Sequence, residues 1–135
     1  MQENFLNQYA TFVDGVTSAP SKDKDAFMAR ISELYDQGCD VSRLMTAASG
    51  LSAEGGEFCE IVKKILFQGK PYNEDNIFHM KRELGDVLWY WVNACTALGI
   101  DPYAVVEENV RKLEARYPGG SFEILRSEVR VAGDL

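Results

Sequence analysis

The sequence predicts an all-α protein, an antiparallel bundle of helices, and two observations lead to this prediction. Apolar residues recur at intervals of three and four along most of the chain, which is the spacing of one face of an α-helix. No segment sustains the alternation of apolar and polar residues that a half-buried β-strand needs. At 135 residues the chain can bury a core of its own. We therefore expect a single domain, residues 1–135, with its core at 41–122 and additions at 1–38 and 123–135.

Two helices are expected ahead of the core. The first covers residues 5–16, and its aromatic and aliphatic residues share one helical face. The segment 17–21, which contains a proline, should interrupt the helix. The second helix covers residues 23–35, and Gly38 should end it.

The core should contain three longer helices. The first begins at residue 40 or 41 and continues to about residue 67, and interruptions near Gly50 and at Gly55–Gly56 remain open. The second follows Asn73, a good N-cap residue, and ends at Gly99. The third starts at Asp101-Pro102, an N-cap followed by a proline in the first helical position. It should stop at the segment 117–120, beyond which a short apolar tail could dock on the body or on a partner.

Four carboxylates form two pairs on the first two core helices. Glu54 and Glu57 are three residues apart, and so are Glu83 and Asp86, so each pair lies on one helical face. Glycines stand between the acids of both pairs, although a glycine inside a helix costs ~0.5–1 kcal/mol relative to alanine. We therefore expect the helices to cross closely at these glycines, which are Gly55, Gly56 and Gly85. Facing carboxylates would favour a hard cation such as Mg²⁺ or Mn²⁺. Two ordinary acidic helix faces are the alternative.

Two sets of basic residues are open to a functional and to a plain structural interpretation. Asn109, Lys112 and Arg116 lie on one stripe of the third core helix and could bind phosphate oxygens. The alternative is a solvated face that pairs with neighbouring glutamates. Lys63 and Lys64 follow Glu60 by about one turn, and salt bridges to glutamate are the expected role for both lysines.

Composition excludes several classes of protein. The net charge of −7 disfavours extended binding of nucleic acid, which requires clustered Lys and Arg. No apolar run is long enough to span a membrane, and the N-terminus lacks the features of a signal peptide. Three scattered cysteines argue against disulfides and zinc and for the cytosol, and buried packing is the role expected for all three. His79 is the single histidine, which argues against a di-iron bundle.

Together the motifs resemble the all-α nucleotide pyrophosphohydrolase superfamily, in particular its small MazG-like members from bacteria and phages. The ExxE motif reads Glu54-Gly55-Gly56-Glu57, and the ExxD motif reads Glu83-Leu84-Gly85-Asp86. The family's Asn-x-x-Lys-Leu-x-x-Arg-Tyr-Pro ending has its counterpart at residues 109–118. The resemblance covers residues 44–122.

The resemblance implies a substrate, a cofactor and an assembly. The reaction would be hydrolysis of a nucleoside triphosphate, with deoxynucleotides favoured, to the monophosphate and pyrophosphate, in control of the nucleotide pool. Members form dimers or tetramers, and the location would be the cytoplasm, or the host cytoplasm for a phage protein. The cofactor would be Mg²⁺, with Mn²⁺ as a possible substitute, and the implied metal ligands are Glu54, Glu57, Glu83 and Asp86.

The resemblance also assigns roles at the substrate. Asn109, Lys112 and Arg116 would contact the triphosphate, with Lys112 also catalytic, while Glu57 is our choice for the residue that activates water. Glu60 would support the ligands or add a metal contact. Aromatic residues near the second acidic pair, such as Trp89 and Phe78, could stack on the nucleobase of the substrate. Packing in the core is the more expected role for these residues. Two alternatives remain, namely hydrolysis of another phosphoanhydride such as an alarmone or nucleotide-sugar, and a non-catalytic helical module that binds a protein.

Overall fold

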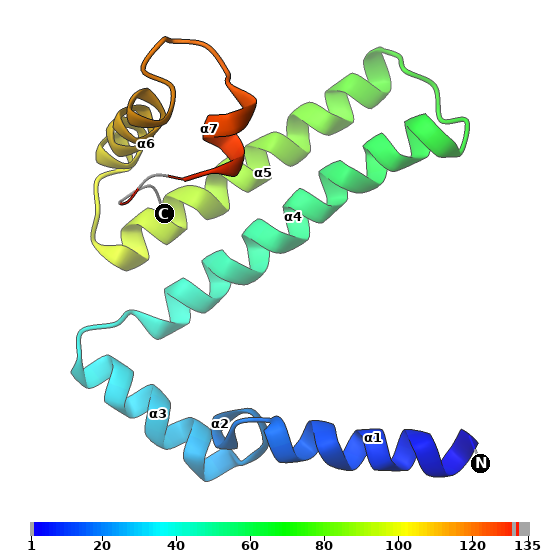
Figure 1. The fold of residues 1–135 in the computed structure, drawn as a ribbon, viewed down its shortest axis with the longest axis vertical. Coiled ribbons are helices and arrows are strands. Elements are labelled where there is room, and N and C mark those ends of the chain that lie inside the picture. Colours follow the sequence, from blue (N-terminus) through cyan, green and yellow to red (C-terminus); the bar gives the residue numbers. More distant parts are fainter. Residues whose placement is uncertain (1, 131, 133–135) are drawn as a thin grey trace. The chain divides into compact units, whose positions relative to one another are not determined.

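The computed structural model describes residues 2–130 and 132, and these residues contain helices and no strand. The prediction of an all-α fold is therefore confirmed (Figure 1). The helices in chain order are α1 (Gln2–Val16), α2 (Ala19–Lys22), α3 (Lys24–Asp36), α4 (Val41–Phe67), α5 (Glu74–Leu98), α6 (Pro102–Arg116) and α7 (Ile124–Glu128).

The chain divides into two compact units, Met1–Ser42 and Arg43–Leu135. In the first unit, the Lys22 ammonium lies 3.1 Å from the Asp14 carboxylate and ties the segment after α1 back to that helix. Asp23 caps α3 by accepting a hydrogen bond of 2.8 Å from the backbone N–H of Ala26. None of the helices in the described part of the chain combines the length and the apolar character needed to cross a bilayer.

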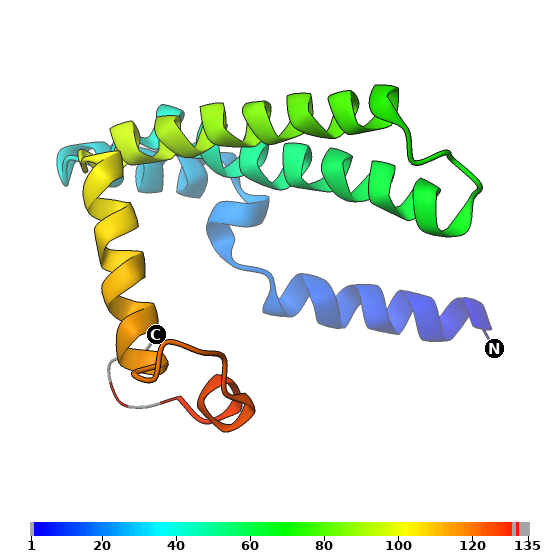
Figure 2. The same cartoon turned by 90° about the horizontal axis from the view of Figure 1, so that it is seen from above.

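The second unit is built on the antiparallel hairpin of α4 and α5, which lie side by side in Figures 1 and 2. Asn73 caps α5 by accepting a hydrogen bond of 3.0 Å from the backbone N–H of Asn76. The side chain of Asn76 is buried, and its amide donates to the carbonyl of Pro71 at 2.6 Å. Gly69, with φ of +72°, supplies the left-handed conformation at the turn. This connection makes α5 return along α4.

α4 and α5 approach closely at Gly50. A Cβ atom at this position would lie 2.1 Å from Cδ1 of Tyr90, so only glycine fits under that ring. One further link joins the helices, because Nη1 of Arg43 donates to Oδ1 of Asn93 at 3.0 Å. α4 is continuous through Gly50, so the interruption considered there is absent.

The other three glycines do not mark a close helix crossing, contrary to the prediction. At Gly55, Gly56 and Gly85 no atom of another segment lies within 4 Å of where a Cβ would stand, so none of the described helices crosses closely at these positions. α4 is also unbroken at Gly55–Gly56, because the backbone hydrogen bonds of the helix need no side chain there. The two helices still approach each other near the acids, but the close contact that sets their spacing lies one turn earlier in α4.

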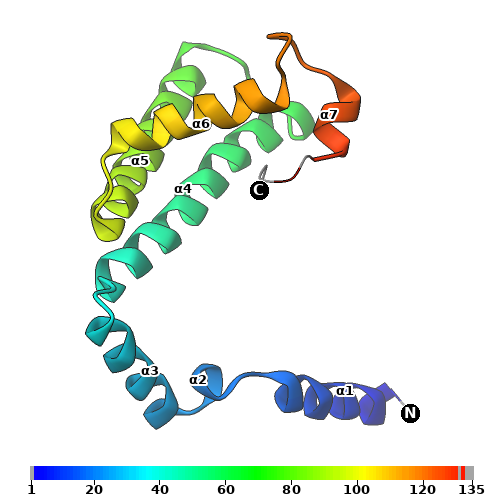
Figure 3. The same ribbon diagram turned by 60° about the vertical axis from the view of Figure 1, so that its left-hand side comes forward.

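The end of the second unit follows its predicted boundaries. Gly99 ends α5 in the left-handed conformation, with φ of +65°. Asp101 caps α6 by accepting from the backbone N–H of Tyr103 at 2.9 Å. After α6 the ring of Tyr117 packs against Phe122 at a centroid distance of 5.6 Å, and the chain turns into α7 (Figure 3).

Few apolar side chains are buried within the second unit. Ala47, Ile61 and Cys95 are buried, whereas many larger side chains of α4 and α5 remain exposed. Cys95 therefore matches the expected packing role, but the prediction is wrong for Cys59, which is exposed. A two-helix hairpin has only one seam in which to bury side chains, which explains the small core.

Candidate metal centre

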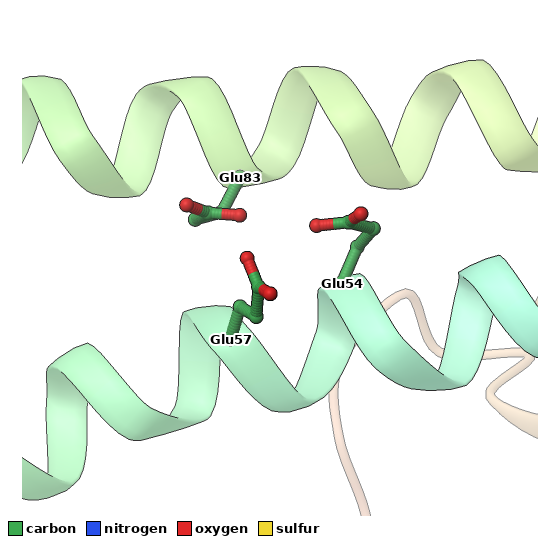
Figure 4. A group of neighbouring side chains, drawn as sticks. All are labelled: Glu54, Glu57 and Glu83. Atoms are coloured by element: carbon green, nitrogen blue, oxygen red, sulfur yellow. The ribbon is translucent and has the colours of Figure 1, made fainter.

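Three of the four predicted carboxylates converge between α4 and α5. Figure 4 shows Glu54 and Glu57 reaching from α4 towards Glu83 on α5. One carboxylate oxygen from each lies within 4.8 Å of the corresponding oxygens of the other two. Glu54 and Glu83 are half-buried and Glu57 is exposed, so the cluster is open to solvent on one side.

The register of the hairpin explains why these residues meet. Gly50 contacts Tyr90, and a step of four residues along α4 to Glu54 is matched by a step of four back along α5 to Asp86. A further step of three brings Glu57 level with Glu83. Steps of three and four follow one face of a helix, so the three pairs lie along the seam between the helices. The spacing of ExxE and ExxD thus translates into two facing pairs.

The cluster carries unbalanced negative charge. The pKa of Glu54 is raised above its ordinary value, first because burial removes water from its carboxylate and then because Glu57, Asp86 and Glu83 are also negative. Asp86, although exposed, is therefore close enough to act on Glu54. A cation among these groups would remove the repulsion.

The donor set suits a hard divalent cation. Oε2 of Glu83 is buried and has no hydrogen-bond partner within the described part of the chain. A buried carboxylate oxygen without a donor costs free energy, and coordination to a cation would satisfy it. All ligands on offer are carboxylate oxygens, which suit Mg²⁺ and Mn²⁺ better than zinc or copper. Glu54, Glu57 and Glu83 therefore fit a cation site, with Asp86 beside them.

Glu60 lies outside this cluster. Its carboxylate accepts from Lys63 at 2.9 Å and from Lys64 at 3.2 Å, and these contacts lower its pKa. The expected salt bridges of both lysines are thus present. A carboxylate whose two oxygens both accept from ammonium groups is a weaker metal ligand. Glu60 therefore differs from the clustered acids, which have no such lysine contacts among the described salt bridges.

The residues predicted to contact phosphate lie on α6. Asn109 and Lys112 line a cavity of about 410 Å³ that also includes Ile100, Val105 and Glu108. None of the four clustered acids lines this cavity. Arg116 is half-buried in the last turn of α6 and is absent from that lining. Asn109 and Lys112 therefore line the same cavity, whose surface is mostly apolar.

A second cavity adjoins the acids and was missed by sequence reasoning. It measures about 480 Å³, and it is lined by Met45, Thr46, Ser49, Gly50, Ala53 and Tyr90. Gly50 lies one turn before Glu54 on the same face of α4, so the cavity lies one helical turn from the cluster. A signal was available in the sequence, because Gly50 and Tyr90 stand four residues from Glu54 and Asp86 respectively.

The aromatic residues near the second acidic pair are more exposed than expected. Trp89 is 58% exposed and Phe78 is 55% exposed, so packing in the core of this chain is the wrong role for both. These side chains lie on faces of α5 for which a single neighbouring helix provides no cover. Trp89 packs its ring edge-on to Tyr90 at a centroid distance of 4.8 Å. Asn93, one turn after Trp89, accepts the hydrogen bond from Arg43 that joins α5 to α4.

Comparison with known proteins shows that the sequence containing these residues matches a protein family. The MazG nucleotide pyrophosphohydrolase domain matches residues 43–121, which include all four acids and the candidates on α6. Gene 37 protein of Mycobacterium phage L5 is 33% identical over 84 residues, which cover 61% of this chain and 74% of that protein. No solved structure gives a significant match. MazG domains typically depend on a divalent metal, in agreement with the acidic cluster. The family match spans more than half of the sequence, and the chain belongs to the MazG nucleotide pyrophosphohydrolase family.

Proposed function

We propose that the protein hydrolyses nucleoside triphosphates, preferably deoxynucleotides, to the monophosphate and pyrophosphate with Mg²⁺, for which Mn²⁺ could substitute. One observation carries the proposal. Glu54, Glu57 and Glu83 converge from two helices, and the buried Oε2 of Glu83 lacks a hydrogen-bond partner among the described residues. Such a set of oxygens binds a divalent cation, and triphosphates reach enzymes as complexes of that kind.

The proposed reaction adds water across the bond between the α-phosphorus and the oxygen that bridges to the β-phosphorus. A new bond forms from the water oxygen to the α-phosphorus, the bridging bond breaks, and pyrophosphate leaves with the bridging oxygen. The bound cation would stabilise negative charge that develops on the phosphates. Glu57 would accept the proton of the attacking water, because it is the exposed one of the three converging glutamates and can reach solvent.

Residues of α6 would hold the phosphate chain. We assign Lys112 to this role as a point charge that supports the departing pyrophosphate, with Asn109 beside it in the same cavity. Arg116 would fork onto two phosphate oxygens. The cavity of about 480 Å³ next to Glu54 would receive the nucleoside, with Tyr90 as its aromatic wall.

The assembly proposed is a homodimer or homotetramer in the cytoplasm. Leu84, Leu88 and Trp89 are each more than half exposed on α5, close in sequence to the metal ligands. Apolar side chains in such number on a helix favour burial against another chain. A second copy would also close the open side of the acidic cluster.

The test is hydrolysis of the eight common ribo- and deoxyribonucleotides with Mg²⁺ or with a chelator, with products separated by ion exchange. We expect metal-dependent monophosphate and pyrophosphate, reduced at least 100-fold in Glu57→Ala. Glu107→Ala, which removes an exposed carboxylate of α6, is the matched control and should retain activity.

The outcome also separates the alternatives. Turnover of an alarmone or a nucleotide-sugar, with none of the eight nucleotides, would replace the substrate and keep the site. Equal activity of Glu57→Ala and wild type would exclude Glu57 from catalysis. No turnover of any phosphoanhydride, with no response to Mg²⁺, would leave a helical module that binds a partner.

A further inference from the structure

α1 carries an apolar face that its own unit leaves uncovered. The six residues concerned are 41–69% exposed, and they are Phe5, Leu6, Tyr9, Phe12, Val13 and Val16. Two of the rings, Tyr9 and Phe12, stack on this face with centroids 6.4 Å apart. The helix lies outside the family match, which begins at residue 43, so the family gives this face no role. Soluble proteins seldom leave an apolar stripe of this kind in water.

The spacing of the stripe suits another helix. Phe5, Tyr9, Phe12 and Val16 follow one another at intervals of four, three and four, as the seam residues of a coiled coil do. Leu6 and Val13 widen the seam on one side. A partner helix could therefore run along the whole length of α1 and contact an apolar residue at each turn.

The charges of α1 disfavour a lipid surface or nucleic acid as its partner. The helix contains no Lys or Arg, and its charged residues are Glu3 and Asp14. Helices that lie on anionic membranes carry Lys and Arg on their polar face, and nucleic acid also requires basic residues. An apolar helix face on a protein is thus the better match.

We propose that α1 pairs through this face with α1 of a second copy of the chain. Three aromatic and three aliphatic side chains, each about half exposed, would bury about 600 Å² per copy. A symmetric pair would then bury about 1,200 Å², which reaches the lower limit of stable protein interfaces. A two-fold axis presents the same face from both copies, so one sequence supplies both halves of the interface.

The first test identifies the neighbour of α1 directly. A benzoyl-phenylalanine replaces Phe12 in full-length protein, and unlabelled and ¹⁵N-labelled chains are mixed, refolded together and irradiated. We expect crosslinked peptides that join α1 of a light chain to α1 of a heavy chain. Crosslinks confined to single chains, crosslinks to another segment, or none at all would overturn the proposal. The same photoreactive residue at Thr11, on the opposite face, should give no α1–α1 product.

The second test measures association by sedimentation equilibrium. Tyr9→Glu with Phe12→Glu places two charges in the face, and Asn7→Glu with Thr11→Glu places two on the opposite side of the same helix. We expect the first pair to weaken self-association at least tenfold and the second to leave it unchanged. Because all four positions are exposed, circular dichroism should show equal helix content. Equal association in both double variants would contradict the proposed interface.

Discussion

Glu54 and Glu83 hold like charges at the seam of two helices, and neither has a basic side chain to balance it within the cluster. Burial and three acidic neighbours raise the pKa of Glu54, and Oε2 of Glu83 is buried without a partner. These residues weaken the hairpin in the absence of a cation, and a site arranged in this way gains stability when a cation binds.

Replacing Glu54 with Gln should therefore stabilise the protein when divalent cations are chelated. Because the pKa of Glu54 is raised in the folded state, the folded protein keeps that proton to higher pH than the unfolded chain. The stability of wild type relative to Glu54→Gln should decrease as pH rises above the ordinary value of 4.5 and through the raised pKa, and stay low at pH 7. Urea denaturation of both proteins at about pH 4 and pH 7 tests this, with the difference expected at pH 7 only.

Glu60→Gln is the matched control, since its pKa is lowered by Lys63 and Lys64. This variant should lose stability at pH 7, where the wild-type carboxylate is charged and paired, and the loss should disappear as pH falls through the lowered pKa. A stabilised Glu60→Gln, or an unchanged Glu54→Gln at pH 7, would contradict the electrostatic description of the two sites.

At the scale of helices, the contact of Gly50 with Tyr90 sets the distance between α4 and α5. The positions of the acidic residues depend on this contact, because Glu54 and Asp86 lie one helical turn from Gly50 and Tyr90 along the same seam. A larger residue at position 50 would have to move Tyr90 or separate the helices. Either change would also alter the spacing of Glu54 and Asp86.

Gly50→Ala should therefore destabilise the protein by about 1–3 kcal/mol, as overpacking does in a well-packed contact. Gly55→Ala adds the same methyl group five residues later, where no described atom outside its own helical turn lies within 4 Å, and should gain ~0.5–1 kcal/mol from helix propensity. Urea denaturation of the two variants gives both values. Tyr90→Ala in the Gly50→Ala background should recover part of the loss, and an equal effect of the two glycine substitutions would refute the contact as the cause.

At the scale of the whole molecule, the chain buries few large apolar side chains by itself. Ala47, Ile61 and Cys95 are buried in the second unit, while large residues of α4, α5 and α6 are exposed. Burial of apolar surface is the main favourable term in folding, so the proposed association would add to the stability of a chain with this distribution.

The melting temperature should accordingly rise with protein concentration. For a dimer that unfolds to separate chains, each tenfold increase in concentration adds about 1.4 kcal/mol per mole of dimer. Because two chains unfold together, this corresponds to roughly 2–3 °C. Scanning calorimetry over a hundredfold range of concentration tests the prediction. A constant melting temperature would show that association contributes nothing to folding, and the proposed assembly would then be wrong.

Much of the helical structure followed from local sequence. Asn73 and Asp101 cap α5 and α6 as expected, and Gly99 ends α5 in the left-handed conformation. Caps and stops depend on residues within one helical turn, so a single sequence contains them in full. The prediction of one domain stays a prediction, and so do the roles assigned to the acids of α4 and α5 and to the three residues of α6.

The sequence by itself determined that the protein is helical, where its main helices begin and end, and which acids share a helical face, because each of these depends on neighbours three or four residues away. The tertiary structure decided which faces meet. It brought Glu54 and Glu57 to Glu83, and it moved the close contact from Gly55 and Gly56 to Gly50. Helix register depends on the shape of side chains from distant segments, and no local pattern contains that information.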